Sequence, residues 1–195
     1  LWIAGKGASA TPSRVILAGV AVSSLFTALT GLLIYRFSDA DQTRKFMFWA
    51  FGDFSQSDMT GTGVLALFLA GGWIYGVRMH RRLDILQLSA WEAHSLGLDA
   101  DRERRKIMGM SALITGATIA FSGPIGFIGL MVPHFLRRMN GGLHHPNLVT
   151  GPLYGGAFLG LCDVLSQAIH PPAGLPIGIV TALAGVPFFV YLLRK

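Results

Sequence analysis

Residues 15–35 read VILAGVAVSSLFTALTGLLIY, a run of 21 residues without a charged side chain. A bilayer core about 30 Å thick is crossed by roughly 20 apolar residues in an α-helix. Hydrophobic residues make up 52% of the chain and charged residues only 13%, whereas about a quarter of the residues are charged in an ordinary soluble domain. The sequence therefore predicts a membrane-crossing helix, in a chain whose outer surface faces lipid.

Five more segments follow the same apolar pattern. They are residues 60–77, 107–122, 125–139, 148–169 and 175–193. We divide the long uncharged stretch at Gly123-Pro124, because proline lacks the amide hydrogen of a helix and clashes with the preceding turn. Helices or closed barrels alone satisfy backbone polar groups in lipid, and the alternating pattern of barrel strands is absent. We expect an all-α, polytopic transmembrane helix bundle with about six spans, forming a single domain over residues 1–195.

Basic residues are distributed unevenly over the two sides that six spans create. One side holds Lys6, Arg14, Arg78, Arg81, Arg82, Arg102, Arg104, Arg105, Lys106, Arg137, Arg138, Arg194 and Lys195. The other side holds Arg36, Arg44 and Lys45. Lysine and arginine are enriched in cytoplasmic loops, so the first group is expected in the cytoplasm. This clustering at membrane edges also accounts for the net charge of +6 without a nucleic-acid partner.

The cytoplasmic loop between the second and third spans, residues 80–106, contains the signals of a short helix. Ser89 and Glu92 have the spacing of a capping box, and Gly97 stands where a left-handed residue ends a helix. We expect a helix over about residues 90–96. A helix this short is marginal alone and needs a partner on its apolar side. The spacing leaves open whether that partner is a protein or the lipid headgroups.

Two long stretches resemble signatures of the FecCD-type permeases of ABC importers, which import ferric siderophores, haem and cobalamin. They are GPIGFIGLMVPHFLRR at 123–138 and LPIGIVTALAGVPFFVYLLRK at 175–195. Residues 13–30 and 81–98 are similar to that family as well. The resemblance covers essentially the whole chain and implies the last six of about ten spans. We therefore expect a fragment, in keeping with a chain that starts at Leu1 without an initiator methionine.

The resemblance also implies that the chain lies in the inner membrane of a bacterium and works with several partners. These are a second permease subunit, identical or related, two ATPase subunits below the pair and a periplasmic substrate-binding protein above it. Glu92, Ala93 and Gly97 resemble the family's E-A-x-x-x-G motif, which implies that this segment, with Trp91, docks onto the ATPase. The chain has no phosphate-binding G-x-x-x-x-G-K-[ST] loop. We therefore expect ATP hydrolysis on a partner chain, and neither enzyme activity nor a bound cofactor in this one.

The first span resembles the family's pore-lining helix. That resemblance implies a gate or pathway role for Thr11, Pro12, Ser13, Ser23, Ser24 and Thr27. The alternative, which we prefer for the hydroxyls inside the span, is a hydrogen bond to the helix's own backbone.

Two polar residues lie inside later spans. Asp163 is the only acid within a span, and we expect it to lock helices together or to face the pathway. His134 is expected to be a satisfied interhelical histidine, with a protonation switch as the alternative. Many members of the family have a basic residue at the position of Gln167 and an acid at that of Gly174, so a docking scheme for the binding protein that uses those charges is in doubt here.

Several other functions stay open on the sequence. A permease of the metal-ion ABC importers would also use a separate ATPase. An ion-coupled secondary transporter would depend on intramembrane acids, and Asp163 is the one available. A membrane enzyme would need a nucleophile–base pair or a cluster of metal ligands, which no span carries. Adjacent His144 and His145 rarely converge on one ion, so we expect no metal site there. A ferric siderophore is the expected cargo, because it is the commonest cargo of the family.

Overall fold

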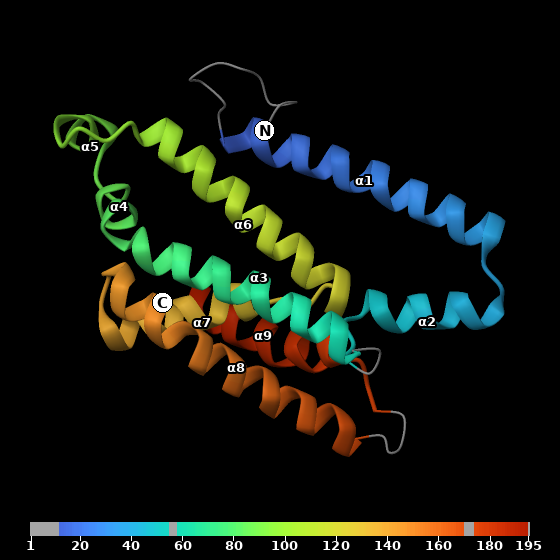
Figure 1. The fold of residues 1–195 in the computed structure, drawn as a ribbon. Helices are drawn as coiled ribbons and strands as arrows, with labels where there is room; N and C mark the ends of the chain where they lie inside the picture. Colours follow the sequence, from blue (N-terminus) through green and yellow to red (C-terminus); the bar gives the residue numbers. More distant parts are fainter. Residues whose placement is uncertain (1–11, 55–57, 170–173, 195) are drawn as a thin grey trace. The chain divides into compact units, whose positions relative to one another are not determined.

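The computed structural model describes residues 12–54, 58–169 and 174–194. Helices make up most of this part, and it contains no strand. They are α1 (Pro12–Phe37), α2 (Ala40–Ala50), α3 (Met59–Arg78), α4 (His80–Ile85), α5 (Ala90–Ser95), α6 (Ala100–Ser122), α7 (Ile128–Asn140), α8 (His144–Ile169) and α9 (Ile177–Leu193). The predicted all-α fold is confirmed, and each of the six predicted segments overlaps one helix (Figure 1).

The chain divides into two compact units, residues 1–47 and residues 48–195. The first contains α1 and most of α2. The sequence analysis missed α2, which begins after Asp39: the Asp39 carboxylate accepts from the Gln42 amide at 2.8 Å, and the Gln42 side chain accepts from the Asp39 amide at 3.4 Å. These two bonds form a capping box that satisfies free amides at the helix start.

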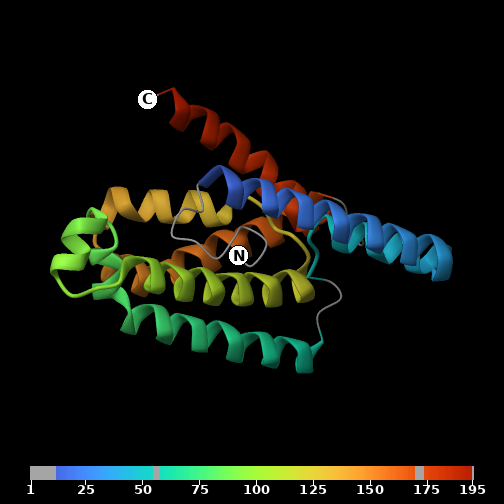
Figure 2. The ribbon, with the colours of Figure 1, turned by 90° about the horizontal axis from the view of Figure 1, so that it is seen from above.

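The second unit is a helix bundle in which α8 contacts more of the other helices than any other element does. α8 contacts α3, α4, α7 and α9, and α3 lies beside α6 (Figures 1 and 2). Among the described residues, three helices are long and apolar enough to cross a membrane: Ser13–Phe37, Met59–Arg78 and His144–Ile169. α9 is apolar but shorter, α6 opens on charged turns, and α7 has 13 residues.

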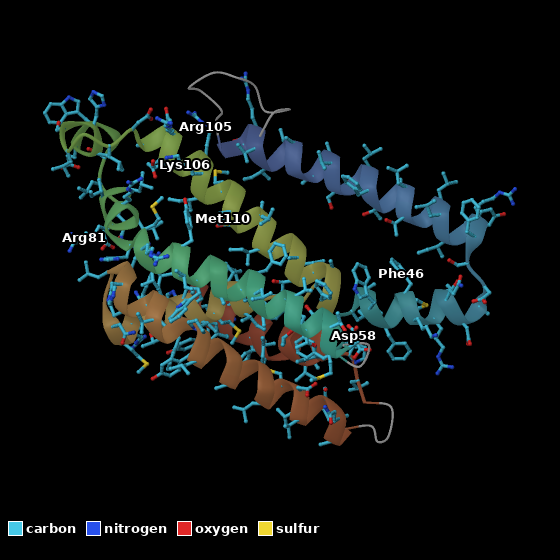
Figure 3. The ribbon with its side chains drawn as sticks, viewed as in Figure 1. Phe46, Asp58, Arg81, Arg105, Lys106 and Met110 are labelled. Atoms are coloured by element: carbon cyan, nitrogen blue, oxygen red, sulfur yellow. The ribbon has the colours of Figure 1, made fainter. Side chains whose placement is uncertain are left out.

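Charge is separated between the two ends of this unit. Arg81, Arg105 and Lys106 lie at the end that holds α4 and α5, whereas Asp58 lies at the opposite end (Figure 3). Asp58 caps α3 there, because its carboxylate accepts from the Gly61 amide at 2.9 Å. The bundle therefore has one strongly basic end, as the distribution of lysine and arginine in the sequence predicts.

The break between α6 and α7 is longer than the sequence predicts. α6 ends at Ser122 as expected, and Gly123 has φ +68°. α7 begins at Ile128 rather than Ile125, because Phe127 adopts a left-handed backbone with φ 67°. A bulky residue pays about 1–2 kcal/mol for that conformation. Its side chain lies against Gly185 of α9, where any Cβ would meet it, so packing offsets the strain.

Three glycines bring main chain against main chain at the end opposite α4 and α5. We call Gly52, Gly123 and Gly178 the glycine junction. A Cβ on Gly123 would meet the carbonyl oxygen of Trp49, and one on Gly178 would meet that of Phe51. The Gly178 amide also donates to the Gly52 carbonyl at 3.4 Å. The junction joins the segment after α2, the break after α6 and the start of α9.

A tryptophan of α3 satisfies a carbonyl that a proline leaves free in α8. Pro152 has no amide hydrogen, so it cannot bond to the carbonyl of Leu148, four residues earlier. The indole Nε1 of Trp73 donates to that carbonyl at 2.8 Å. α3 and α8 are therefore joined by a hydrogen bond that replaces a missing helical one.

Candidate functional site

The first turn of α5 is closed by its own side chains. Ser89 Oγ accepts from the Glu92 amide at 3.3 Å, and Glu92 Oε2 accepts from the amide of Ser89 at 2.9 Å and from its hydroxyl at 2.8 Å. The bonds from Ser89 lower the pKa of Glu92 below its ordinary value. The predicted capping box is confirmed, and the Glu92 carboxylate accepts both of its bonds from Ser89.

The other end of α5 is closed by backbone bonds around a glycine. The Gly97 amide donates to the His94 carbonyl at 2.9 Å, and the Leu98 amide donates to the Ala93 carbonyl at 3.0 Å. This pair of bonds is a Schellman motif, in which the residue after the cap is left-handed. Gly97 has φ +77° and open space around it. Glycine is therefore needed at this position for its backbone conformation, as predicted.

The motif residues of α5 divide into those that shape the helix and those that present a surface. Ala93 is 1% exposed, so it faces inward. Trp91 is 79% exposed and Leu96 62% exposed; we call these two side chains the apolar tip. A capped helix with an exposed tryptophan is suited to insertion into a partner's groove, since tryptophan is among the commonest hot-spot residues at protein interfaces.

A buried carboxylate connects this loop to α6. Glu103 is 5% exposed, and its two oxygens pair with Arg82 of α4 at 3.2 Å and with Lys106 at 2.6 Å. The Lys106 bond is the main cause that lowers the pKa of Glu103; burial opposes it, and Arg82 adds to it. The Arg82 pair thus ties α4 to the first turn of α6, and the Lys106 pair lies within α6.

We expect Glu103→Gln to reduce stability at pH 7 by roughly 1 kcal/mol, because both cations are half exposed. The pKa of Glu103 is lower in the folded protein than its ordinary value of 4.5. Its ionised carboxylate therefore contributes fully to stability above pH 4.5, and this contribution is lost as the pH falls through the pKa of the folded state. The wild-type advantage should therefore shrink between pH 7 and about pH 3. Thermal unfolding of the purified wild-type and variant proteins at pH 7 and at about pH 3 measures this stability difference. The exposed Asp101→Asn is the control. An equal difference at both pH values would contradict the ion-pair assignment.

A second carboxylate connects the loop to α8. Asp84 Oδ1 on α4 accepts from the backbone amide of His144 at 2.9 Å and lies 2.7 Å from its ring Nδ1. Burial alone would raise the pKa of Asp84, but the bonds from His144 outweigh it and lower the pKa. Gln87 donates to the Gly142 carbonyl at 3.1 Å beside them. His144 is thus engaged by Asp84.

The candidate pathway residues lie on α1, within the first unit. Pro12 and Ser13 open the helix, and Thr11 lies outside the described residues. Ser23, Ser24 and Thr27 are exposed along it. Thr27 Oγ1 donates to the Ser23 carbonyl at 2.9 Å, which confirms the own-helix interpretation for this hydroxyl.

The two intramembrane polar residues lie on α7 and α8. The ring of His134 lies edge-on to that of Phe188 of α9, with centroids 6.2 Å apart. Asp163 accepts from Gln167 Nε2 at 2.8 Å. That bond closes within α8 and not between helices. The glutamine that stands in place of a basic residue is therefore the residue that engages the acid.

Sequence reasoning overlooked the residues that hold the loop in place, Asp84 and Glu103. The pairing of Glu103 with Lys106 has a visible signal, since they are three residues apart on one helix. The bond from Asp84 to His144 joins positions 60 residues apart, and no local pattern indicates it.

Known proteins similar to this chain are transport permeases. The model of the FecCD transport family matches residues 1–195. The hemin transport system permease protein HmuU of Yersinia pestis is 38% identical over 184 residues, covering 94% of this chain and 54% of that protein. The Fe(3+) dicitrate transport system permease protein FecD of Escherichia coli is 33% identical over 188 residues, covering 94% and 57%.

A third relative and a solved structure agree with these. The cobalamin import system permease protein BtuC of Halobacterium salinarum is 34% identical over 192 residues, covering 98% of this chain and 51% of that protein. An inward-facing structure of a metal-chelate type ABC transporter superposes with a TM-score of 0.86 at 30% identity, covering 95% of this chain and 60% of that chain. The chain thus spans about half the length of the curated relatives that it matches.

Proposed function

We propose that this chain, which belongs to the FecCD transport family, is part of the membrane-embedded permease of an ABC importer for a metal chelate. The observation that carries the proposal is α5: a helix capped at both ends, at the basic end of the bundle, with Trp91 and Leu96 exposed. A partner ATPase would bind the apolar tip from the cytoplasm, the side to which the basic residues assign this end.

The proposed cargo is a ferric siderophore, with haem and cobalamin as alternatives. The three relatives are named for hemin, cobalamin and Fe(3+) dicitrate, and all three cargoes are metal ions held by an organic chelator. The complete permease would pair with a second subunit, take its cargo from a substrate-binding protein, and lie in the inner membrane of a bacterium. Uptake of a panel of ferric siderophores, haem and cobalamin by the reconstituted complex tests the cargo, and the absence of uptake of every member would contradict it.

Two alternative functions, an ion-coupled secondary transporter and a permease for free metal ions, differ from the proposed one in energy source or in the species transported. An ion-coupled carrier needs an acid that exchanges protons or ions, and here Asp163 is bonded to Gln167. We expect uptake to continue when the proton gradient is collapsed and ATP is held constant. Uptake that follows the proton gradient would support secondary transport. A permease for free metal ions would transport the ion without its chelator, which a free metal salt added to the panel detects.

The apolar tip gives a direct test of the ATPase contact. We expect Trp91→Ala in the complete permease to weaken ATPase binding by about 30-fold or more, since truncation of a hot-spot tryptophan costs about 2 kcal/mol or more. Insertion and folding should be unchanged, because the side chain is 79% exposed. The measurement is binding of the purified ATPase to the permease in detergent.

The matched control is Met59→Ala, which removes an even more exposed apolar side chain (92%) at the opposite end of the bundle. It should bind the ATPase as the wild type does. Equal binding by Trp91→Ala and the wild type would rule out the tip as the contact.

A further inference from the structure

We propose that Asp84 is the positioning residue that carries movement of the α4–α5 loop to α8, by holding the first residue of α8 from outside the helix. The inference rests on the proposed function, because it assigns to the ATPase the force that moves α5. It goes beyond that function in naming the joint and the helix that receives the motion.

The joint consists of a helix cap that comes from another helix. The first amides of a helix have no partner within it, and α8 has the Asp84 carboxylate of α4 on its first amide, that of His144, at 2.9 Å. The same oxygen lies 2.7 Å from the His144 ring. A carboxylate at a helix N-terminus is also favoured by the helix dipole. Displacement of α4 therefore pulls directly on the start of α8.

Gln87 strengthens the joint from the same loop. Its side chain donates to the Gly142 carbonyl at 3.1 Å and lies 3.0 Å from His144 Nδ1. The α4 segment thus contacts both the turn before α8 and the first residue of α8. Both members of the central pair are mostly covered, with 26% of the Asp84 side chain and 22% of the His144 side chain exposed.

The first two turns of α8 are bonded together as one piece. Asn147 donates to the carbonyls of Gly141 at 3.0 Å and Leu143 at 2.8 Å. Thr150 accepts from Asn140, the last residue of α7, at 3.0 Å. A pull on His144 therefore moves residues 140–150 together, including the end of α7.

The piece ends at a weak point in the helix. Pro152 cannot bond to the Leu148 carbonyl, so the ladder of α8 lacks a hydrogen bond just beyond Thr150, and prolines are the usual sites of helix kinks. The start of α8 can therefore turn at Pro152 relative to residues 153–169. Those residues contain Asp163, and α8 packs beside α9. Asp84 contacts the first residue of the part of α8 that turns at Pro152.

The ion pairs of Glu103 do not serve the same purpose. The Arg82 pair ties α4 to the first turn of α6, and the Lys106 pair lies within α6. The start of α6 already follows α5 along the chain after four residues. α8, in contrast, begins 49 residues after the end of α5. Among the described contacts between the loop and α8, those of Asp84 with His144 are the shortest.

The test compares uptake with ATP hydrolysis in the complete transporter reconstituted in liposomes. Asp84→Ala removes the acceptor, and we expect at least a tenfold fall in cargo imported per ATP hydrolysed, with ATPase binding retained. Asp84→Asn keeps an oxygen for the His144 amide, so it should recover most of that ratio. The control that keeps the wild-type ratio is Asp101→Asn, an exposed carboxylate in the first turn of α6.

His144→Pro provides a second route that does not depend on the folding of the alanine variant. It removes the amide and ring donors together, yet proline is well tolerated at the first position of a helix. We expect the same fall in the ratio. An unchanged ratio in whichever of Asp84→Ala and His144→Pro folds would overturn the proposal, as would a lower yield of protein with normal import per ATP. If the wild-type permease and every variant failed to bind the ATPase, that result would instead refute the proposed function.

Discussion

Replacing Gly178 by alanine is expected to prevent the second unit from folding. The new Cβ would meet the carbonyl oxygen of Phe51, which is main chain and cannot rotate away. Overpacking a rigid site costs about 1–3 kcal/mol and occasionally more, and the start of α9 would also lose its approach to Gly52. Gly123→Ala should be at least as severe, because it adds a left-handed backbone to a clash with the Trp49 carbonyl. The yield of monodisperse protein after detergent extraction measures both effects.

The chain contains a matched control for these substitutions. Gly155 lies in the interior of α8, and a Cβ there meets nothing within 4 Å in the described part of the chain. Gly155→Ala should therefore give close to wild-type yield, and a glycine in a helix interior is itself less favourable than alanine by about 1 kcal/mol. Normal yield for Gly178→Ala would show that the three segments do not approach as closely as described.

Replacing Trp73 by phenylalanine is expected to destabilise the contact between α3 and α8 by about 2 kcal/mol. Phenylalanine keeps an aromatic ring but removes the donor to the Leu148 carbonyl. An acceptor left without a partner costs about 1–3 kcal/mol, and more where no water reaches it in lipid. The change in unfolding free energy in denaturant measures the loss.

A double substitution separates this hydrogen bond from the other contacts of the indole. Pro152→Ala restores an amide that can bond to the Leu148 carbonyl within α8. In that background Trp73→Phe should cost clearly less than it does alone, by about 1 kcal/mol or more. Equal costs in the two backgrounds would show that Trp73 contributes by packing and not by replacing the lost helical bond.

Signals between residues close in sequence were predictable, because the chain itself sets their distance. The capping box of Ser89 and Glu92 joins residues three apart, and Gly97 closes the same helix. The break at Gly123-Pro124 follows from the covalent structure of proline. The resemblance of the chain to FecCD-type permeases also identified its family from motifs that can be quoted from the sequence.

Contacts between distant segments were not predictable, because they depend on the path of the chain. Trp73 and Leu148 are 75 residues apart, and the glycines of the junction come from three separate segments. The predicted start of α7 at Ile125 was wrong for the same reason. The left-handed backbone of Phe127 is stable because Gly185 of α9 makes room for its ring. Gly178 lies within the quoted stretch 175–195, but no local pattern indicates that it lies against the carbonyl of Phe51.

The length of α7 has a consequence for how this part of the permease meets lipid. Thirteen residues rise roughly 20 Å, whereas the hydrocarbon core is about 30 Å thick. α7 therefore falls about 10 Å short of a full crossing, and any part of residues 123–127 that reaches the hydrocarbon needs shelter from protein or a water-filled cavity, because acyl chains offer no hydrogen bonds. In the assembled transporter we therefore expect protein or water, and not lipid tails, to contact the backbone of residues 123–127.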